Sequence, residues 1–246
     1  MPTIGLLYPG HSAEDDYARL EERLGGRLRL PLVHTSVGED AHRVDALLDL
    51  GGADRLAQGA RALVEEHSPD AVLWACTSGS FVFGWEGAHD QVAALQEVSG
   101  VPTSSTSLAF VHACAALGLT RVSVAASYPQ DVAEHFVDFL GHGGVEVTAM
   151  GSHGIVTAAE VGTLGEADVT ALVASADLSG GAEAVLVPDT AMHTLAWLES
   201  LERTAGVPVL TANQVTVWEG LNLLGEASSD DWPDPTLGTL FRMRGA

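Results

Sequence analysis

Short apolar runs alternate with longer amphipathic segments along most of the chain. The runs are bounded by Gly, Pro or charged residues, as strands usually are. The predicted strands are residues 3–9, 29–35, 71–75, 100–107, 121–129, 146–150, 182–187 and 206–213. The segments between them predict helices at 12–24, 40–50, 54–67, 88–98, 108–117, 130–140, 166–176, 191–201 and 215–224, with 81–85 as a loop. Strands alternating with helices are typical of parallel sheets covered on both faces.

The second half of the chain repeats the pattern of the first. Residues 70–80 read Asp-Ala-Val-Leu-Trp-Ala-Cys-Thr-Ser-Gly-Ser, and residues 183–191 read Glu-Ala-Val-Leu-Val-Pro-Asp-Thr-Ala. Gly-Val-Pro occurs at 100–102 and again at 206–208. We therefore predict an α/β protein of two pseudo-symmetric lobes, each a parallel four-stranded sheet flanked by helices, with the active site in the cleft between them.

The position of the repeat also predicts the lobe boundaries. Residues 1–118 together with the C-terminal tail, 214–246, are expected to form the first lobe. Residues 119–213 are expected to form the second lobe.

Cys76 and Asp189 are the candidate catalytic pair. Aligning the two halves places Cys76 opposite Asp189 and Thr77 opposite Thr190. Because ligands of parallel sheets bind at the carboxyl ends of strands, we expect Cys76 and Asp189 to face one pocket and move protons there. The N–H groups of the following helix are expected to lower the pKa of Cys76, so that it is a thiolate. The alternative is a buried structural cysteine.

Other polar residues have structural interpretations. Asp189 is also placed to cap a helix beginning at Ala191, and Ser12 to cap the first helix. Cys114 lies on an apolar helix face and is expected in the core. His11, His153 and His193 lie near strand ends, but no pair has metal-ligand spacing, so no metal is expected. Five other histidines are expected at solvated helix or loop positions: His42, His67, His89, His135 and His142.

Composition narrows the choice of partners and compartment. The net charge is −22 and Lys is absent, which disfavours nucleic acid and anionic membranes as partners and excludes lysine Schiff bases. No dinucleotide, phosphate-loop or serine-hydrolase motif occurs in the chain. Two cysteines, no signal-peptide pattern and no apolar run long enough for a bilayer predict a cytoplasmic protein.

Five short motifs carry a resemblance to a known family. They are Ile-Gly-Leu-Leu-Tyr-Pro at 4–9, Cys-Thr-Ser-Gly at 76–79, Gly-Val-Pro-Thr at 100–103, Ala-Ser-Tyr-Pro at 126–129 and Gly-Val-Pro at 206–208. In this order the chain resembles the aspartate/glutamate racemase superfamily, within it the maleate cis-trans isomerase and arylmalonate decarboxylase branch. The resemblance implies two lobes enclosing a small carboxylate, no cofactor and a homo-oligomer.

The same resemblance implies roles for individual residues. Cys76 matches the first-lobe cysteine, whereas Asp189 stands where the second cysteine is expected. An arylmalonate-type decarboxylase keeps the second cysteine and lacks the first, so this chain is the reverse. The residues implied to hold the substrate carboxylate are Thr77, Ser78, Tyr128 and Thr190, with Ser12 where maleate isomerases have an Asn.

Three functions follow from these observations. The first is a cofactor-independent isomerase of the maleate type, in which the Cys76 thiolate adds to a small carboxylate or dicarboxylate. The second is a decarboxylase, in which Cys76 protonates the product. Its apolar pocket is expected to be lined by Trp74, Phe81, Phe83 or Trp85. The third is a carboxylate-binding protein without catalysis.

Overall fold

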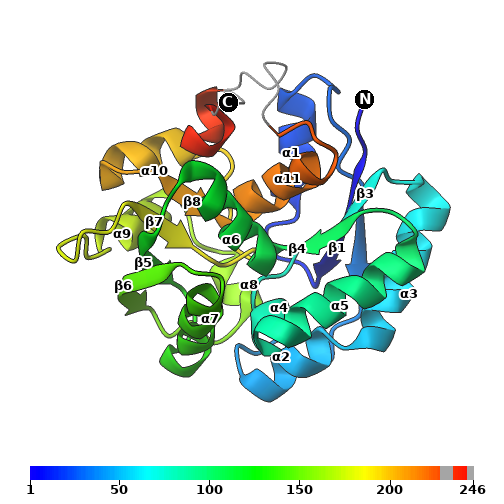
Figure 1. Ribbon diagram of the computed structural model, residues 1–246, viewed down its shortest axis with the longest axis horizontal. Coiled ribbons are helices and arrows are strands. Elements are labelled where there is room, and N and C mark those ends of the chain that lie inside the picture. The colour runs from blue at the N-terminus through cyan, green and yellow to red at the C-terminus, as the bar shows by residue number, and fades with distance from the viewer. Residues whose placement is uncertain (228–234, 243–246) are drawn as a thin grey trace.

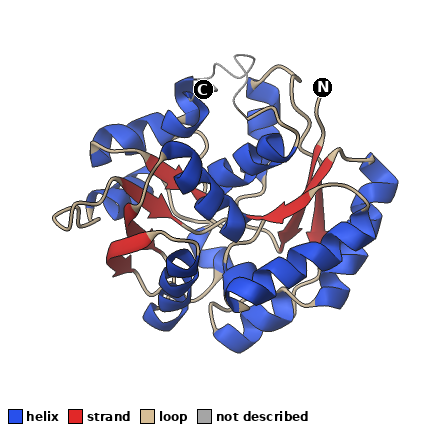
Figure 2. Cartoon of the chain, in the orientation of Figure 1, coloured by secondary structure: helices blue, strands red, loops and turns tan. Residues whose placement is uncertain are grey.

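Two parallel four-stranded sheets lie side by side, each covered by helices (Figures 1 and 2). The computed structural model describes residues 1–227 and 235–242. The strands are β1 (Ile4–Pro9), β2 (Leu32–Thr35), β3 (Ala71–Trp74), β4 (Thr103–Ser105), β5 (Arg121–Ala126), β6 (Glu146–Ser152), β7 (Ala184–Val187) and β8 (Val209–Thr211). Their orders are β2-β1-β3-β4 and β6-β5-β7-β8. The predicted α/β fold is confirmed.

Eleven α-helices and two short 3₁₀ helices surround the sheets in the described residues. The α-helices are α1 (Asp15–Arg23), α2 (Val44–Leu50), α3 (Ala53–His67), α4 (Ser78–Phe81), α5 (Gly84–Ser99), α6 (Thr106–Leu117), α7 (Gln130–His142), α8 (Ala158–Val161), α9 (Glu166–Ala174), α10 (Leu198–Ala205) and α11 (Ala212–Leu223). None of the described helices is long and apolar enough to cross a bilayer.

The central strands explain why the apolar runs were readable in the sequence. Every residue of β3 and β7 is buried, because helices cover both faces of each sheet. Strands buried on both faces need continuous apolar runs rather than alternation. The repeat is also preserved in register: Val72 pairs with Thr103 in one sheet, and Val185 pairs with Val209 in the other.

Two local predictions were wrong, and one short helix was not predicted. The loop predicted at 81–85 is helical in large part, because α4 ends at Phe81 and α5 begins at Gly84. Helix α8 was missed, because a single turn is too short to show periodicity. Helix α10 begins at Leu198 rather than near 191, since the backbone N–H of Thr194 is bound by the carboxylate of Asp16 instead of a helical carbonyl.

Helices α6 and α11 pack against each other between the two sheets (Figure 1). A hydrogen bond of 2.6 Å joins the buried hydroxyls of Thr106 and Thr216 across this contact. Helix α11 contacts β3 and β4 of one sheet and β8 of the other, so it lies against both sheets. The predicted boundaries at 118 and 214 stay a prediction, and residues 228–234 and 243–246 of the tail lie outside the described part.

Asp16 on α1 joins the two lobes. It is buried, and its Oδ2 accepts hydrogen bonds from the backbone N–H groups of Thr194 at 2.8 Å and Leu195 at 3.1 Å. The side-chain amide of Asn213 donates a third bond at 3.1 Å. These contacts hold the carboxyl ends of the two sheets toward one space.

Candidate active site

A cavity of about 190 Å³ lies where the carboxyl ends of β1, β3 and β7 approach each other. Residues from both lobes form its walls. They are Tyr8, Pro9, Gly10, His11, Ser12, Val37, Glu39, Asp40, Ala41, His42, Leu47, Leu50, Cys76, Ser78, Ala158, Ala159, Asp189, Thr190 and Ala191. Of the predicted site residues, the structure therefore brings Cys76, Asp189, Ser12, Ser78 and Thr190 together at this cavity.

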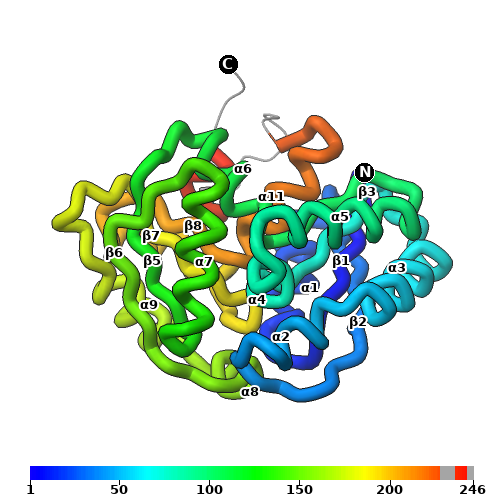
Figure 3. Tube along the Cα trace, turned by 60° about the horizontal axis from the view of Figure 1, so that its bottom comes forward, coloured from blue at the N-terminus to red at the C-terminus, as the bar shows by residue number. Residues whose placement is uncertain are grey.

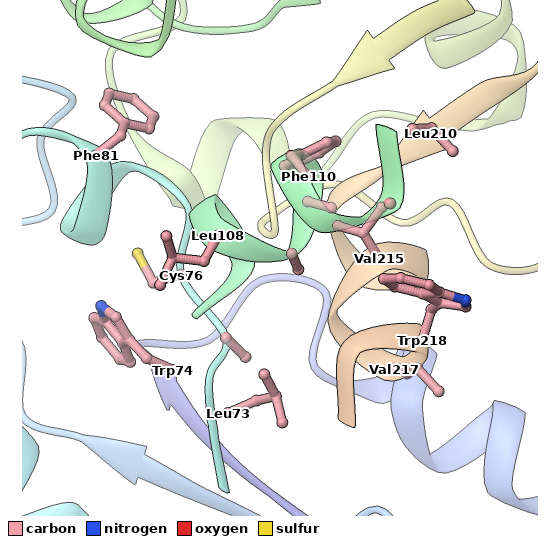
Figure 4. Close-up of a cluster of buried hydrophobic side chains, with 14 of the residues drawn as sticks. Leu73, Trp74, Cys76, Phe81, Leu108, Phe110, Leu210, Val215, Val217 and Trp218 are labelled. Carbon is pink, nitrogen blue, oxygen red and sulfur yellow. The ribbon is translucent and has the colours of Figure 1, made fainter. Parts of the chain in front are cut away.

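Cys76 follows β3 and is 3% exposed. Its Sγ accepts the backbone N–H of Gly79 at 3.3 Å and lies 3.9 Å from Ser78 Oγ. A Cβ atom on Gly79 would lie 3.1 Å from both this sulfur and the Trp74 ring, so glycine permits the close approach of the N–H. Figure 4 shows the sulfur directed away from Phe110.

The environment of Cys76 does not favour the predicted thiolate. Burial raises the pKa of the thiol to about 12, and the nearby charge of Asp189 acts in the same direction. The hydrogen bonds from Gly79 and Ser78 lower the pKa, but they offset only part of the loss of hydration. Cys76 is therefore a neutral thiol at neutral pH, and the expected thiolate was wrong for the protein without substrate.

Asp189 follows β7 and is 4% exposed. Its Oδ2 accepts a short hydrogen bond from the Ser127 hydroxyl, and its Oδ1 accepts the backbone N–H of Ala191 at 2.9 Å. It does not cap α10, which begins only at Leu198, so the capping interpretation was wrong. The carboxylate is instead fixed at the wall of the cavity.

His42 is the site residue that the sequence analysis missed. Its side chain is 4% exposed rather than solvated, and its Nε2 lies 4.0 Å from Asp189 Oδ2. Nδ1 lies 2.9 Å from the carbonyl oxygen of Ile155. Because a carbonyl only accepts, Nδ1 carries a proton and Nε2 faces the carboxylate. His42 therefore places a ring nitrogen beside the Asp189 carboxylate at the cavity wall.

Tyr8 lines the cavity and connects the two lobes. Its hydroxyl donates to the carbonyl of Thr190 at 3.0 Å, accepts the N–H of Ala13 at 3.1 Å and lies 2.7 Å from Ser12 Oγ. Burial raises the pKa of Tyr8, so the phenol stays protonated. Ser12 does not cap α1, whose N-cap is Glu14; its hydroxyl belongs to the Tyr8 network.

Thr77 and Tyr128 do not belong to the cavity wall. The Tyr128 hydroxyl is fully buried and donates to the carbonyl of Pro188 at 2.7 Å. Thr77 Oγ1 is buried and makes no hydrogen bond within the described residues. The role of both residues in holding a carboxylate stays a prediction. It requires that their side chains move so that their hydroxyls face the cavity.

The four aromatic residues expected to line a decarboxylase pocket lie elsewhere. Trp74 donates from its indole to the carbonyl of Gly79, and Phe81 packs against Phe136 in the core. Phe83 lines a separate surface groove. Of the described residues, none of the four, Trp74, Phe81, Phe83 and Trp85, forms part of the wall of the cavity that holds Cys76.

A loop of the first lobe and a helix of the second close one side of the cavity. Asp40 accepts the backbone N–H groups of Ala158 and Ala159 at 2.8 and 3.1 Å, at the start of α8. The backbone N–H of His42 donates to the carbonyl of Val156 at 2.7 Å. Figure 3 shows α8 next to α2 at this side of the molecule.

Known proteins share this architecture and, in part, this sequence. A family model described as arylmalonate decarboxylase matches residues 50–234. Arylmalonate decarboxylase of Bordetella bronchiseptica is 28% identical over 98% of this chain and 96% of its own length. Maleate isomerase of Nocardia farcinica is 30% identical over 85% of this chain and 84% of its own length.

Solved structures agree with these sequence matches. An arylmalonate decarboxylase variant with a glycine changed to cysteine and a cysteine changed to serine has a TM-score of 0.84 at 25% identity, covering 98% of this chain and 99% of its own. A maleate cis-trans isomerase variant from Nocardia farcinica, with a covalent succinylcysteine intermediate, has a TM-score of 0.86 at 23% identity, covering 98% of both chains. The chain therefore belongs to the arylmalonate decarboxylase family, in the branch that also contains the maleate isomerases.

Proposed function

We propose that the protein is a cofactor-independent isomerase that converts a small cis dicarboxylate, such as maleate, to its trans isomer. The observation that carries the proposal is that Cys76 and the carboxylate of Asp189 line the same buried cavity. A thiol that adds to a double bond and a second group that moves a proton are the two functions this reaction needs.

The size of the cavity supports a small aliphatic substrate. Its volume of about 190 Å³ is below the range of about 300–1,000 Å³ typical of sites for drug-sized ligands. The side chains of Val37, Leu47 and Leu50 give it an aliphatic wall. The 30% identical maleate isomerase supports this reaction class, and the solved maleate cis-trans isomerase variant with a covalently bound succinylcysteine intermediate supports addition by a cysteine.

The reaction proceeds by addition, rotation and elimination. Sγ of Cys76 bonds to one alkene carbon while its proton passes to Asp189, which delivers a proton to the other alkene carbon. The thioether now has a single carbon–carbon bond, which rotates. Asp189 removes a proton from the second carbon, and the C–S bond breaks with its electron pair going to the sulfur. The trans alkene is released, and Asp189 returns the proton to Sγ of Cys76. No atom or electron is gained or lost overall.

The neutral state of Cys76 fits this sequence of steps. A pKa of about 12 keeps the proton on sulfur until a substrate is present, and the addition then needs both the sulfur and that proton. The Ser127 hydroxyl donates to Asp189 Oδ2, and His42 Nε2 lies 4.0 Å from the same oxygen.

Hydroxyl and imidazole groups are the expected ligands for the substrate carboxylates. Ser12, Ser78 and Thr190 present hydroxyl groups at the wall, and His42 and His11 supply the two imidazoles. No Lys or Arg is among the described wall residues. Binding of a dianion therefore depends on hydroxyl and N–H donors of the wall.

Two alternatives are less well supported. Arylmalonate decarboxylation is favoured by the 28% identical relative, but the aromatic side chains expected for an aryl pocket lie outside the cavity. A carboxylate-binding protein without catalysis would explain the Asp at position 189. Both alternatives are outcomes of the experiment below.

The test is turnover of maleate followed by proton NMR, with Cys76→Ala compared with the wild-type protein. Loss of at least about 10³-fold in kcat/KM is expected, because the variant has no atom that can bond to the alkene. Cys114→Ala is the matched control, since this buried thiol lies outside the cavity. Full activity of Cys76→Ala, or CO₂ release from an arylmalonate without fumarate formation, would overturn the proposal.

A further inference from the structure

A second group of ionisable side chains lies at the entrance to the cavity. His11, Glu14 and His34 each offer one nitrogen or oxygen atom, and these three atoms lie within 4.8 Å of one another. His11 Nδ1 is 2.9 Å from Glu14 Oε1, and His34 Nε2 is 3.5 Å from the same oxygen. His11 also lines the cavity, so the group lies next to the candidate active site.

The fold brings these residues together from separate segments. His34 lies on β2, where it pairs with Tyr8 of β1. His11 and Glu14 are in the turn that follows β1 and leads into α1. The parallel pairing of β1 and β2 therefore places the end of β2 beside this turn. His34 is far from His11 and Glu14 in the sequence, so no ligand spacing along the chain predicts that the three residues meet.

Glu14 is positioned by a contact that leaves one oxygen for the group. Its Oε2 accepts the backbone N–H of Ser12 at 2.7 Å, whereas Oε1 faces both imidazoles. Hydrogen bonds that orient a ligating carboxylate are typical of metal sites. The side chain of Glu14 is 25% exposed, so the orienting bond is only partly open to water.

The two imidazoles lie beside each other and face one carboxylate oxygen. The ring centroids of His11 and His34 are 4.1 Å apart, and a nitrogen of each ring lies within 3.5 Å of Glu14 Oε1. Neutral imidazole nitrogens and a carboxylate oxygen are the ligand atoms that a divalent ion of the zinc class uses.

We propose that His11, Glu14 and His34 bind a divalent transition-metal ion of the zinc class at the entrance to the cavity. Two histidines and one glutamate are a known ligand set for zinc sites that keep a fourth position open. The net charge of −22 favours cation binding in general, and the two imidazoles make this site selective for zinc-class ions over calcium or magnesium.

The open position suggests a role that rests on the proposed function. Glu39 and Asp40 place negative charge at the cavity wall, where His11 also lies. A metal ion bound to His11 would add a positive charge there that can bind a carboxylate. It would draw an anionic substrate toward a surface that otherwise repels it. The expected effect is on KM for maleate rather than on kcat, because the ion lies at the entrance and not at Cys76.

The binding test uses the full chain after treatment with a chelator. Co²⁺ is added and the d–d absorption of the bound ion is recorded, followed by displacement with Zn²⁺. One ion per chain is expected, with the strong absorption of a four-coordinate site. His11→Ala, Glu14→Gln and His34→Ala should each lose at least about 10-fold to 100-fold in affinity, because each removes a ligand.

His89→Ala is the matched control, because His89 is an exposed histidine outside the group. It should bind Co²⁺ as the wild-type protein does. Absence of saturable binding in the wild-type protein, or equal affinity in the wild-type protein and the His34→Ala variant, would overturn the metal site. Circular dichroism of each variant confirms that it is folded.

The substrate role is separated from binding by a second measurement. Maleate turnover of the chelated protein is compared with that of the Zn²⁺-loaded protein, and a lower KM after loading is expected. Equal KM values would overturn the recruiting role while the absorption data still establish the site. Absence of turnover in both samples would overturn the proposed function and leave the metal site standing.

Discussion

Cys76 lies in a cavity whose walls also carry Asp189, so that burial and a neighbouring negative charge both oppose loss of its proton. Proteins that activate a thiol in the free state place it beside a cation or a well-exposed helix N-terminus. Here the backbone N–H of Gly79 and the hydroxyl of Ser78 partly compensate for the lost hydration. The thiol therefore stays protonated and weakly nucleophilic in the protein without substrate.

Alkylation of Cys76 by iodoacetamide tests this state. In a Cys114→Ala background, the rate should rise about tenfold per pH unit from pH 7 to 10 without a plateau, because only the thiolate reacts. The pKa of about 12 lies above this whole range. Asp189→Asn removes the negative charge that raises the pKa, and it should therefore speed alkylation at each pH. Mass spectrometry of the labelled peptide gives both rates.

The control for this measurement is the Cys76→Ala, Cys114→Ala protein, which should take up no label. A plateau in the rate near pH 8 would show that the thiol ionises in its ordinary range. Equal rates in the presence and absence of the Asp189 charge would contradict the electrostatic contact between the two side chains.

At the scale of elements, an ion pair joins helices α6 and α11 between a half-exposed histidine and a buried carboxylate. His112 Nδ1 on α6 lies 2.7 Å from Glu219 Oε1 on α11, and the Glu219 side chain is 0% exposed. The hydrogen bond to Glu219 raises the pKa of His112 above its usual value, although desolvation acts against the shift. A buried carboxylate needs such a partner, since leaving it unpaired costs free energy.

His112→Ala should lower the free energy of unfolding by about 1–3 kcal/mol at pH 6, because Glu219 loses its charged partner. A raised pKa in the folded state means that the stabilisation is complete below about pH 6.5. It is lost as the pH rises through the folded-state pKa. The difference in melting temperature between wild-type and variant proteins should therefore be larger at pH 6 than at pH 9.

His142→Ala is the comparison for that experiment, since His142 is an exposed residue near the end of α7. Its melting temperature should follow that of the wild-type protein at both pH values. A His112→Ala deficit that grows from pH 6 to pH 9 would contradict the direction of the His112 shift.

At the scale of the whole molecule, the site exists because two similar sheets point their carboxyl ends at one space. Asp16 contributes most visibly to this arrangement, since it accepts three hydrogen bonds from the second lobe and α11 while buried. Asp40 makes a comparable connection at the other side, by binding the first N–H groups of α8. Both contacts join segments far apart in sequence.

Asp16→Ala should lower the free energy of unfolding by at least about 3 kcal/mol, because it leaves three donors without their acceptor. Urea unfolding followed by tryptophan fluorescence measures the change. Glu22→Ala, at an exposed position of the same helix, should cost less than about 0.5 kcal/mol. Equal losses in the two variants would show that Asp16 does not hold the lobes together.

Much of the architecture was decided by the sequence alone. The eight predicted apolar runs correspond to the eight described strands, because a strand buried on both faces of a parallel sheet needs a continuous run of apolar residues. The copied Ala-Val-Leu segments became the central strands β3 and β7, which place Cys76 and Asp189 at equivalent positions after them. Strand ends can be located from such a pattern, and with them the residues that follow.

The tertiary structure alone decided which polar side chains reach the cavity. His42 is buried because a loop of one lobe hydrogen-bonds to Ile155 and Val156 of the other. Tyr128 turns to a backbone carbonyl, and His11, Glu14 and His34 meet only because β1 and β2 pair. Loop placement depends on single contacts between distant residues, and such contacts leave no periodic pattern in the chain.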